Sequence, residues 1–519
     1  MLKRNRVEIL IAAILFLVGF IYVCTLVRGE THLQRPYNAH SLEFRAENNS
    51  NLPSTIRHFN LDDEIYFIVP HDMPKMSVLT IIDEATFTAY DEQVNIDKLE
   101  TVNGRPIHII RSNFPVMYLD IDHEASGMSW EEFNIPENGK DITCVGTMHL
   151  NPSGAPIGDS DSSYDFVKEK ENTSSITLSR HGTSSWTMCG KHSYNLKLPE
   201  KASLLGLEST KTYALIANGK DKSLMRTYIA NELAKKLDCD YTVNMKYITL
   251  YVDNAYRGVY LLTEKPKKIM EENIENSEDS FAVNWLTPSE GQVIHFTDHN
   301  EEFSDDIDMA EQNGLSALVV YPDPMTKKES YYEKKVQDFI DEIGAGDFTN
   351  IDEDSFIRYY WVQEVTKNYD AWYRSFYSVY DGKSEQWKAG TPWDFDMSLS
   401  NFGLYKNIDF SNAEGLVGSH GFYKDLYSKD EIRNQITHTY NSDVIPSLKE
   451  LLGDIDDVYN YIKTDADIDY RYINTDRPDM HAPQFESFVF GGSHEEAATN
   501  MKVFLINRIK YLDSIYKLE

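Results

Sequence analysis

The sequence predicts an α+β protein whose first half is rich in strands and whose second half is mainly helical. Short runs of β-type residues, separated by turn signals, recur up to about residue 264. Amphipathic helical patterns dominate from residue 330 onward. A third observation, an apolar run over residues 9–27, predicts one transmembrane helix ahead of this body, because about 20 helical residues span a bilayer.

The N-terminal run also indicates an orientation and a compartment. Lys3, Arg4 and Arg6 precede it, which by the positive-inside rule keeps residues 1–8 cytoplasmic and exports the chain that follows. No small-x-small cleavage site follows the run, so an uncleaved signal anchor is favoured over a cleaved signal peptide. We therefore expect a single-pass cell-membrane protein with a polar linker over residues 28–55 and an extracellular bulk.

Two segments are expected after the linker. Residues 56–157 form a β-rich segment without obvious chemistry, and residues 158–519 hold the remaining elements. Their first helix, over residues 221–237, is amphipathic and can be capped by Asp221, and the acidic stretch 270–329 is interpreted as a connector. The expected strands are 175–179, 193–198, 247–252 and 258–263, and the later helices are 330–343, 354–368, 441–452, 454–463 and 495–516.

Composition limits the function classes. The chain has 519 residues with 50 basic and 83 acidic side chains, a formal charge of −33, which argues against a nucleic-acid partner because no surplus exists to neutralise phosphates. Most of this acidity is interpreted as a solubilising surface. Four cysteines without a Cys-x-x-Cys motif argue against a disulfide scaffold, a structural zinc site and a dithiol redox site.

Two acidic segments in the second half are candidates for chemistry. One ends in Asp370, and the other is Trp393-Asp394-Phe395-Asp396. On an extended backbone Asp394 and Asp396 share a face, which suits a divalent cation with oxygen ligands. With Asp370 as a third carboxylate, the group predicts a magnesium–phosphate site. The alternative is an aspartate-capped loop beside a buried tryptophan.

The first half offers lysines that could hold phosphate. Lys191 and Lys197 lie in or near a predicted strand after a turn of small residues, and a lysine on a strand can bind phosphate as a point charge. A solvated surface lysine is the common alternative. The sequence contains neither a P-loop nor a dinucleotide-binding glycine fingerprint.

Several ordered blocks of sequence resemble the CotH kinases, atypical protein kinases first associated with the bacterial spore coat. They include a K-x-x-Y-x-L-K-L strand, a D-x-S-L-x-R helix start and a Y-x-G-x-Y-L-L-x-E hairpin strand. His181 and Thr183 stand where many relatives have Arg and Asn. The blocks lie at residues 114–119, 181–186, 191–198, 221–226, 256–264, 367–370 and 393–396.

The resemblance implies a bilobal, atypical protein-kinase-like fold that binds ATP and Mg²⁺ between a β-rich N-terminal lobe (about 173–269) and a mainly helical C-terminal lobe (about 330–519). It puts Asp370 in the catalytic loop and Asp394 and Asp396 in the metal-binding segment. The nucleotide-binding residues that it implies are Lys191 as the best phosphate-binding lysine, with Lys197 still open, together with Ser184, Arg226 and Glu264.

The function expected from these features is that of an exported, membrane-tethered kinase. It would transfer the γ-phosphate of ATP, with Mg²⁺, to Ser or Thr of a protein on the cell surface or spore envelope. The expected partners are therefore ATP, an acceptor protein and the membrane, and no nucleic acid. The alternatives are a catalytically inactive scaffold at the cell surface or spore envelope and a carbohydrate-binding surface module.

Overall fold

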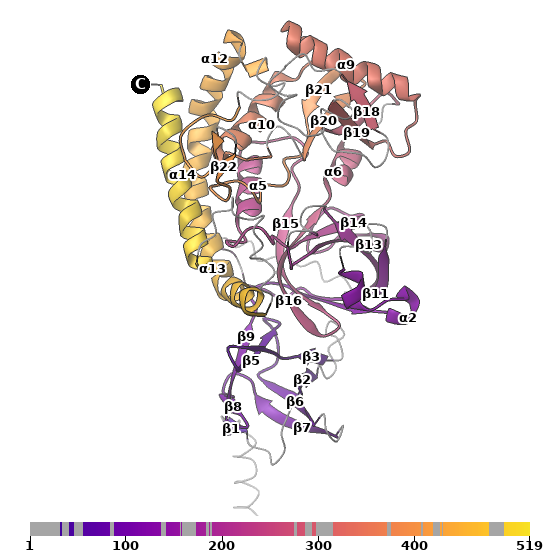
Figure 1. Ribbon diagram of the computed structural model, residues 1–519, viewed down its shortest axis with the longest axis vertical. Helices are drawn as coiled ribbons and strands as arrows, with labels where there is room; N and C mark the ends of the chain where they lie inside the picture. The colour runs from indigo at the N-terminus through magenta and orange to yellow at the C-terminus, as the bar shows by residue number, and fades with distance from the viewer. Residues whose placement is uncertain are drawn as a thin grey trace, which may run out of the picture.

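The computed structural model shows an elongated α+β molecule with strands at one end and helices at the other (Figure 1). A closed β-barrel lies between these ends, and two long helices, α13 and α14, run side by side along the helical part. The structure describes residues 32–33, 41–45, 55–83, 88–135, 142–155, 157, 173–182, 186, 189–274, 278–285, 293–296, 315–370, 375–405, 408–418, 426–427, 429–476 and 492–518.

Two small sheets form the N-terminal end of the described chain. Their strand orders are β1-β8-β9-β5-β4 and β3-β2-β6-β7. Phe44 and Phe67 join the sheets through an edge-to-face contact with ring centroids 4.6 Å apart. The strands are β1 (His32–Leu33), β2 (Ser41–Arg45), β3 (Thr55–Arg57), β4 (Phe59–Leu61), β5 (Glu64–Val69), β6 (Met76–Asp83), β7 (Thr88–Asn95), β8 (Thr101–Val102) and β9 (Arg105–Arg111).

The barrel has seven strands in the order β10-β11-β12-β13-β14-β16-β15 and closes through parallel pairing of β10 with β15. Side chains alternate along each strand, so that Leu196 and Leu262 fill the interior while Lys197 points outward. The strands are β10 (Val116–Ile121), β11 (Thr143–Asn151), β12 (Thr173–His181), β13 (Ser193–Ala202), β14 (Thr210–Ile216), β15 (Met245–Val252) and β16 (Ala255–Glu264).

Helices and a third sheet pack on one outer side of the barrel. The sheet has the order β18-β19-β17-β20-β21, with β17 (Phe281–Trp285), β18 (Val293–Phe296), β19 (Leu315–Tyr321), β20 (Phe376–Asp381) and β21 (Gln386–Ala389). One continuous core joins this region to outward-facing barrel residues such as Tyr247 and Leu261. The main helices are α5 (Arg226–Lys236), α6 (Pro266–Asn273), α9 (Glu329–Ala345), α10 (Glu353–Thr366), α12 (Asp430–Thr439), α13 (Ile445–Asp476) and α14 (His494–Tyr516).

The bilobal kinase-like fold expected from the resemblance is wrong. A closed seven-strand barrel stands where a kinase-like lobe was expected, and the helical part contains a five-stranded sheet. Three of that sheet's strands, β17, β18 and β19, come from the stretch interpreted as a connector. Acidic residues around these short apolar runs mask their strand pattern in the sequence. What makes β17 a buried strand is its long-range pairing with β19 and β20, which no local pattern indicates.

The first helix of the second segment is shorter than predicted. It begins at Arg226, because Leu224 adopts a left-handed backbone with φ of 57°, which a helix cannot contain. Asp221 therefore does not cap the helix directly. Its carboxylate instead accepts hydrogen bonds from the backbone N–H groups of Ser223 (2.9 Å) and Arg226 (2.8 Å), which fixes the loop before the helix.

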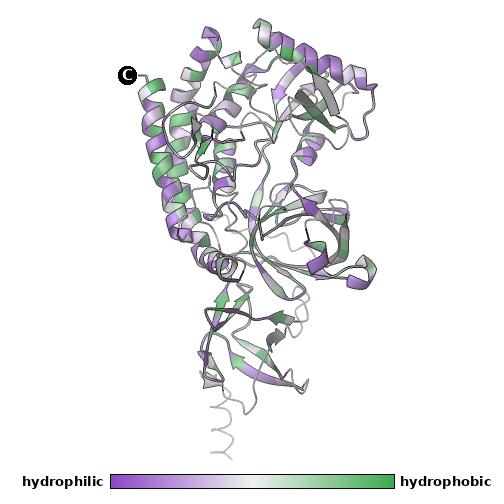
Figure 2. Cartoon of the chain, in the orientation of Figure 1, coloured by the Kyte–Doolittle hydropathy of each residue, from purple (hydrophilic) through white to green (hydrophobic). Residues whose placement is uncertain are grey.

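The expectation of a transmembrane helix and a single-pass membrane location is corrected by the structure. In the part of the chain that the structure describes, no helix has both the length and the apolar character needed to cross a membrane. Figure 2 shows polar and apolar residues mixed along the longest helices, α13 and α14. The apolar run 9–27, on which the expectation rested, lies outside the described residues.

Candidate functional site

The segment that follows β21 places two of the predicted aspartates. It is not the extended strand that the sequence analysis assumed, because Asp394 has a left-handed backbone with φ of 66° and the chain turns after it. A non-glycine residue in this conformation is strained and needs support from its surroundings. The Ser375 hydroxyl provides one such contact by donating a hydrogen bond to Asp394 Oδ2 at 2.9 Å.

Asp396 is a buried carboxylate that is only partly compensated. Its Oδ2 lies 3.8 Å from the Lys220 Nζ, and its Oδ1 is buried with no hydrogen-bond partner. Burial raises the pKa of Asp396 to about 6, an effect that Lys220 opposes and Asp394 reinforces. The side chain therefore carries a charge at neutral pH with an acceptor atom still available for a ligand.

Lys220 is the residue that sequence reasoning missed. It lies in the loop between β14 and α5 and is 7% exposed. Burial lowers the pKa of Lys220, but the carboxylates of Asp396, Asp394 and Asp370 together hold that pKa above its ordinary value. These three carboxylates therefore lie within electrostatic range of one ammonium group. The only signal in the sequence is the turn-like run Asn218-Gly219-Lys220-Asp221 between a strand and a helix.

Two backbone contacts hold this loop against the aspartate segment. The Asn401 side-chain amide donates to the Lys220 carbonyl at 2.9 Å and to the Asp396 carbonyl at 2.7 Å. Arg226, one of the predicted nucleotide-binding residues, donates from Nε to the Leu399 carbonyl at 3.2 Å. Since both donors are buried, the Lys220–Asp396 geometry is set by packing and not by the flexibility of a surface loop.

Asp370 follows the C-terminal end of α10, where Lys367 ends the helix with φ of 47°. The Asp370 side chain is buried, and its backbone N–H donates to Asn368 Oδ1 at 3.3 Å. The Lys367 ammonium group is taken up by a neighbouring loop, where it donates to three backbone carbonyls, those of Asp409, Asn412 and Glu414. Lys367 thereby anchors the turn that presents Asp370.

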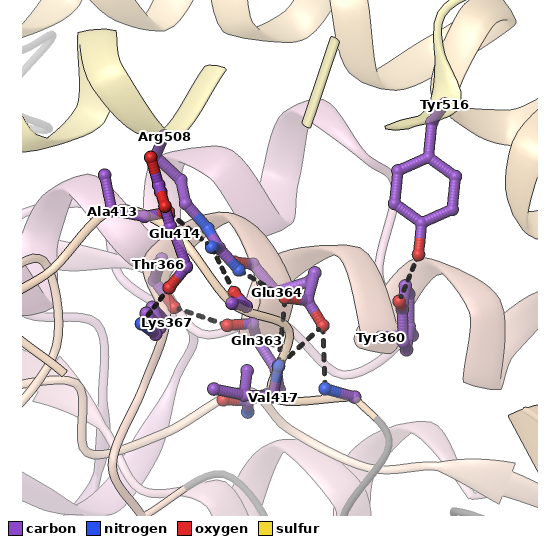
Figure 3. A network of polar contacts seen from close by, with 12 residues as sticks. Tyr360, Gln363, Glu364, Thr366, Lys367, Ala413, Glu414, Val417, Arg508 and Tyr516 are labelled. Carbon is purple, nitrogen blue, oxygen red and sulfur yellow. Dashed lines mark hydrogen bonds and ion pairs between the residues drawn. The ribbon is translucent and has the colours of Figure 1, made fainter. Parts of the chain in front are cut away.

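A fully buried ion pair joins the same helix to the same loop (Figure 3). Glu364 of α10 and Arg508 of α14 both have side chains with no exposed surface. The backbone of the loop after β23 (Ile408–Asp409) satisfies their remaining groups. It supplies the carbonyls of Ala413 and Gly415 to Arg508 and the N–H groups of Val417 and Gly418 to Glu364.

The two predicted phosphate-binding lysines lie in different surroundings, and Lys191 pairs with an aspartate outside the predicted group. The Lys191 Nζ donates to Asp469 Oδ2 of α13 at 2.9 Å and to the Val259 carbonyl at 2.5 Å, with its side chain 4% exposed. This ion pair ties α13 to the barrel. Lys197 is exposed on the outer surface of β13.

Two more predicted nucleotide-binding residues make structural contacts. Arg226 forms a buried ion pair with Asp221 in addition to its contact with Leu399. The Glu264 carboxylate accepts backbone N–H groups of Glu208 (2.8 Å) and Asn244 (2.7 Å), which joins the end of β16 to two loops. Ser184 lies outside the described residues.

The donor set around Asp394 and Asp396 fits a magnesium ion bound together with a phosphate. Within the described ranges, no group of three or more His, Cys, Asp and Glu side chains is arranged to hold a metal ion. Magnesium commonly takes only one or two carboxylates and completes its coordination with water and substrate phosphates. The buried, unpartnered Oδ1 of Asp396 and the nearby carboxylate of Asp394 provide such a pair.

Comparison with known protein families assigns this chain to a family. The family model described as CotH kinase protein matches residues 178–512, which is 512 − 178 + 1 = 335 of the 519 residues. The chain therefore belongs to the CotH kinase protein family, and the predicted family is confirmed. The family's name suggests kinase activity or a spore-coat role. A search of the curated proteins found no match.

Proposed function

We propose that this chain is an ATP-dependent protein kinase that uses Mg²⁺ to phosphorylate a Ser or Thr hydroxyl of an acceptor protein. The observation that carries the proposal is the grouping of Asp370, Asp394 and Asp396 around Lys220, with one buried oxygen of Asp396 left without a partner. A buried carboxylate oxygen without a hydrogen-bond partner is costly, so its presence favours a site that is completed by a ligand. The family assignment supports the same activity.

The chemistry requires mostly positioning and electrostatic stabilisation. Asp394 and Asp396 would hold Mg²⁺, which when bound neutralises phosphate charge. Lys220 keeps its positive charge at neutral pH, because the surrounding carboxylates hold its pKa up, and it can therefore oppose the negative charge of the transferred group.

Asp370 is the proposed proton acceptor. It takes the proton as the acceptor O–H bond breaks, a new bond forms between that oxygen and the γ-phosphorus, and the bond to the bridging oxygen of ADP breaks. The buried turn anchored by Lys367 fixes the position of this carboxylate. A fixed base raises the rate because the reacting groups lose no further freedom on reaction.

The test is transfer of labelled γ-phosphate by the full chain with MgCl₂, measured both as autophosphorylation and on dephosphorylated casein as a generic acceptor. We expect Asp394→Asn to lower the initial rate by about 1,000-fold, since it removes a metal-binding charge from the transition state. Asp341→Asn, an exposed position on α9, is the matched control and should retain the full rate. If the unmodified chain incorporates no more label than Asp394→Asn, the kinase proposal is wrong and the inactive scaffold replaces it.

A further inference from the structure

The outer face of the barrel meets the candidate site at His181, the last residue of β12. The His181 ring lies edge-on to Trp393, the neighbour of Asp394, with ring centroids 6.2 Å apart. Its Nδ1 is hydrogen-bonded to Asn195 Oδ1 of β13 at 2.9 Å. The barrel surface around Asn195 is therefore directly adjacent to the segment that carries two of the site aspartates.

Lys265 extends this same surface. Asn195 pairs with Ala214, and Ala214 pairs with Thr263, so these three residues form one row across β13, β14 and β16. Lys265 comes two residues after Thr263 in an extended conformation (φ −90°, ψ 141°), which puts it on the same outer face. Burial lowers the pKa of His181 to about 4. Lys265 on the barrel lowers this pKa further and Asp394 raises it, so both residues lie within electrostatic range of the His181 ring.

Among the described residues the Lys265 ammonium group has no hydrogen-bond or ion-pair partner, although the side chain is largely shielded from solvent. Its neighbours in the same helix differ, because Lys267 pairs with Asp323 and Lys268 pairs with Glu271. The chain has 83 acidic residues, so a shielded lysine without a carboxylate partner is unusual in it. Such an ammonium group attracts an external anion more strongly than a lysine that is already paired.

We propose that Lys265 binds the polyphosphate of the nucleotide from the barrel side of the site, opposite Asp394 and Asp396. This inference rests on the proposed kinase function and names a residue that the sequence analysis did not consider. The ammonium group supplies a point charge to a phosphate oxygen, while His181 and Trp393 fill the space between the barrel and the aspartate segment. The N-terminal end of α6, which begins at Pro266 directly after Lys265 and has no side-chain cap, adds partial positive charge at the same place.

The test is calorimetric binding of ATP and of adenosine to the full chain in MgCl₂, at pH 7. Lys265→Met should weaken ATP binding at least 10-fold and leave adenosine binding unchanged, because a charged contact to phosphate is lost and the base is not involved. Lys265→Arg, which keeps the charge, should bind ATP within about threefold of the unmodified chain. Lys268→Met is the matched control on the same helix and should bind ATP normally, since its ammonium group is paired with Glu271.

Each result decides one of the two proposals. Equal ATP affinity in Lys265→Met and the unmodified chain overturns the inference about Lys265 and leaves the kinase proposal standing. An unmodified chain that binds no ATP in the presence of Mg²⁺ overturns the kinase proposal, and the inference with it. Misfolding is separated from lost contact by thermal denaturation, because removing an unpaired, shielded charge should leave the melting temperature of Lys265→Met unchanged or raised.

Discussion

Buried charges occur in two neighbouring regions of this molecule, and their surroundings differ. Around Arg508 every guanidinium nitrogen donates a hydrogen bond, and both oxygens of Glu364 accept from backbone N–H groups or from Arg508 (Figure 3). In the candidate site, Lys220 lies 3.8 Å from Asp396, and one oxygen of that carboxylate has no partner. Both regions contact the C-terminal half of α10 or the turn that follows it.

The difference separates a structural role from a binding role. A fully satisfied network inside a protein is rigid and specifies one arrangement of the elements it joins. A buried group that lacks a hydrogen-bond partner lowers the stability of the fold. It keeps its position only where the surrounding packing holds it there, which is also what a ligand-binding site needs. We infer that the Arg508 network holds α10 in place, so that Asp396 can keep its long contact with Lys220 and its unpartnered oxygen without rearranging.

The largest expected effect is on the satisfied network. Arg508→Met should lower the free energy of unfolding by about 4 kcal/mol, because Glu364 is left as a buried, unpaired carboxylate. Lys502→Met on the same helix is the matched control. It breaks the surface pair with Asp456 and should cost less than about 1 kcal/mol. Urea denaturation measures both, and equal losses would show that the buried network has no special structural role.

A somewhat smaller effect is expected at Lys191, whose ion pair with Asp469 resembles the Arg508 network more than the candidate site. Lys191→Met should lower the free energy of unfolding by about 3 kcal/mol, because the buried carboxylate of Asp469 loses its charged partner. The KM for ATP, measured well below the unfolding temperature, should not change. A large rise in that KM, at an unchanged melting temperature, would instead show that Lys191 binds the phosphates and does not act only in stabilising the fold.

The sequence predicted those parts of the fold and site that depend on local pattern. The hairpin of β15 and β16 and the long helices α9, α10 and α14 follow from residue periodicity within one segment. Barrel closure does not, because β10 pairs with β15 across more than a hundred residues and no local signal encodes that contact. The parts of the fold that depend on long-range strand pairing therefore could not be predicted from the sequence.

The same limit applies to the candidate site. Asp370, Asp394 and Asp396 were predicted as a group, and the structure places all three within electrostatic reach of Lys220. Lys220 itself was missed because its significance comes from packing against Asn401 and Asp396, nearly two hundred residues further along the chain. The extended geometry assumed for Asp394 was wrong because a left-handed backbone has no reliable marker at an aspartate.

The smallest expected change in stability has the opposite sign and concerns Asp396. Asp396→Asn should raise the free energy of unfolding at pH 7 by about 1–2 kcal/mol, since a shielded carboxylate with an unpaired oxygen is replaced by a neutral group of the same shape. The same variant should lower phosphate transfer at least 100-fold, because the proposed metal ligand loses its charge. A variant that is less stable and fully active would remove Asp396 from the site.

The pH dependence gives this prediction a second readout. The folded pKa of Asp396, about 6, lies above that of an unfolded aspartate, so between about pH 4 and 6 the folded state holds the proton more strongly. The contribution of this group to stability is therefore present below about pH 4 and is lost as the pH rises through 6. The stability advantage of Asp396→Asn should grow across that window and then level off.

Burial also raises the pKa of Asp465 to about 6, but Asp465 is present in both proteins and its effect cancels in their difference. Asp465→Asn is the control that should leave phosphate transfer intact, because the Asp465 carboxylate accepts a hydrogen bond from Ser112 beside β15 and not from a residue of the candidate site. If the difference between Asp396→Asn and the unmodified chain is constant from pH 4 to 7, the carboxylate is not strained in the folded state, and the contrast with the Arg508 network has a different cause.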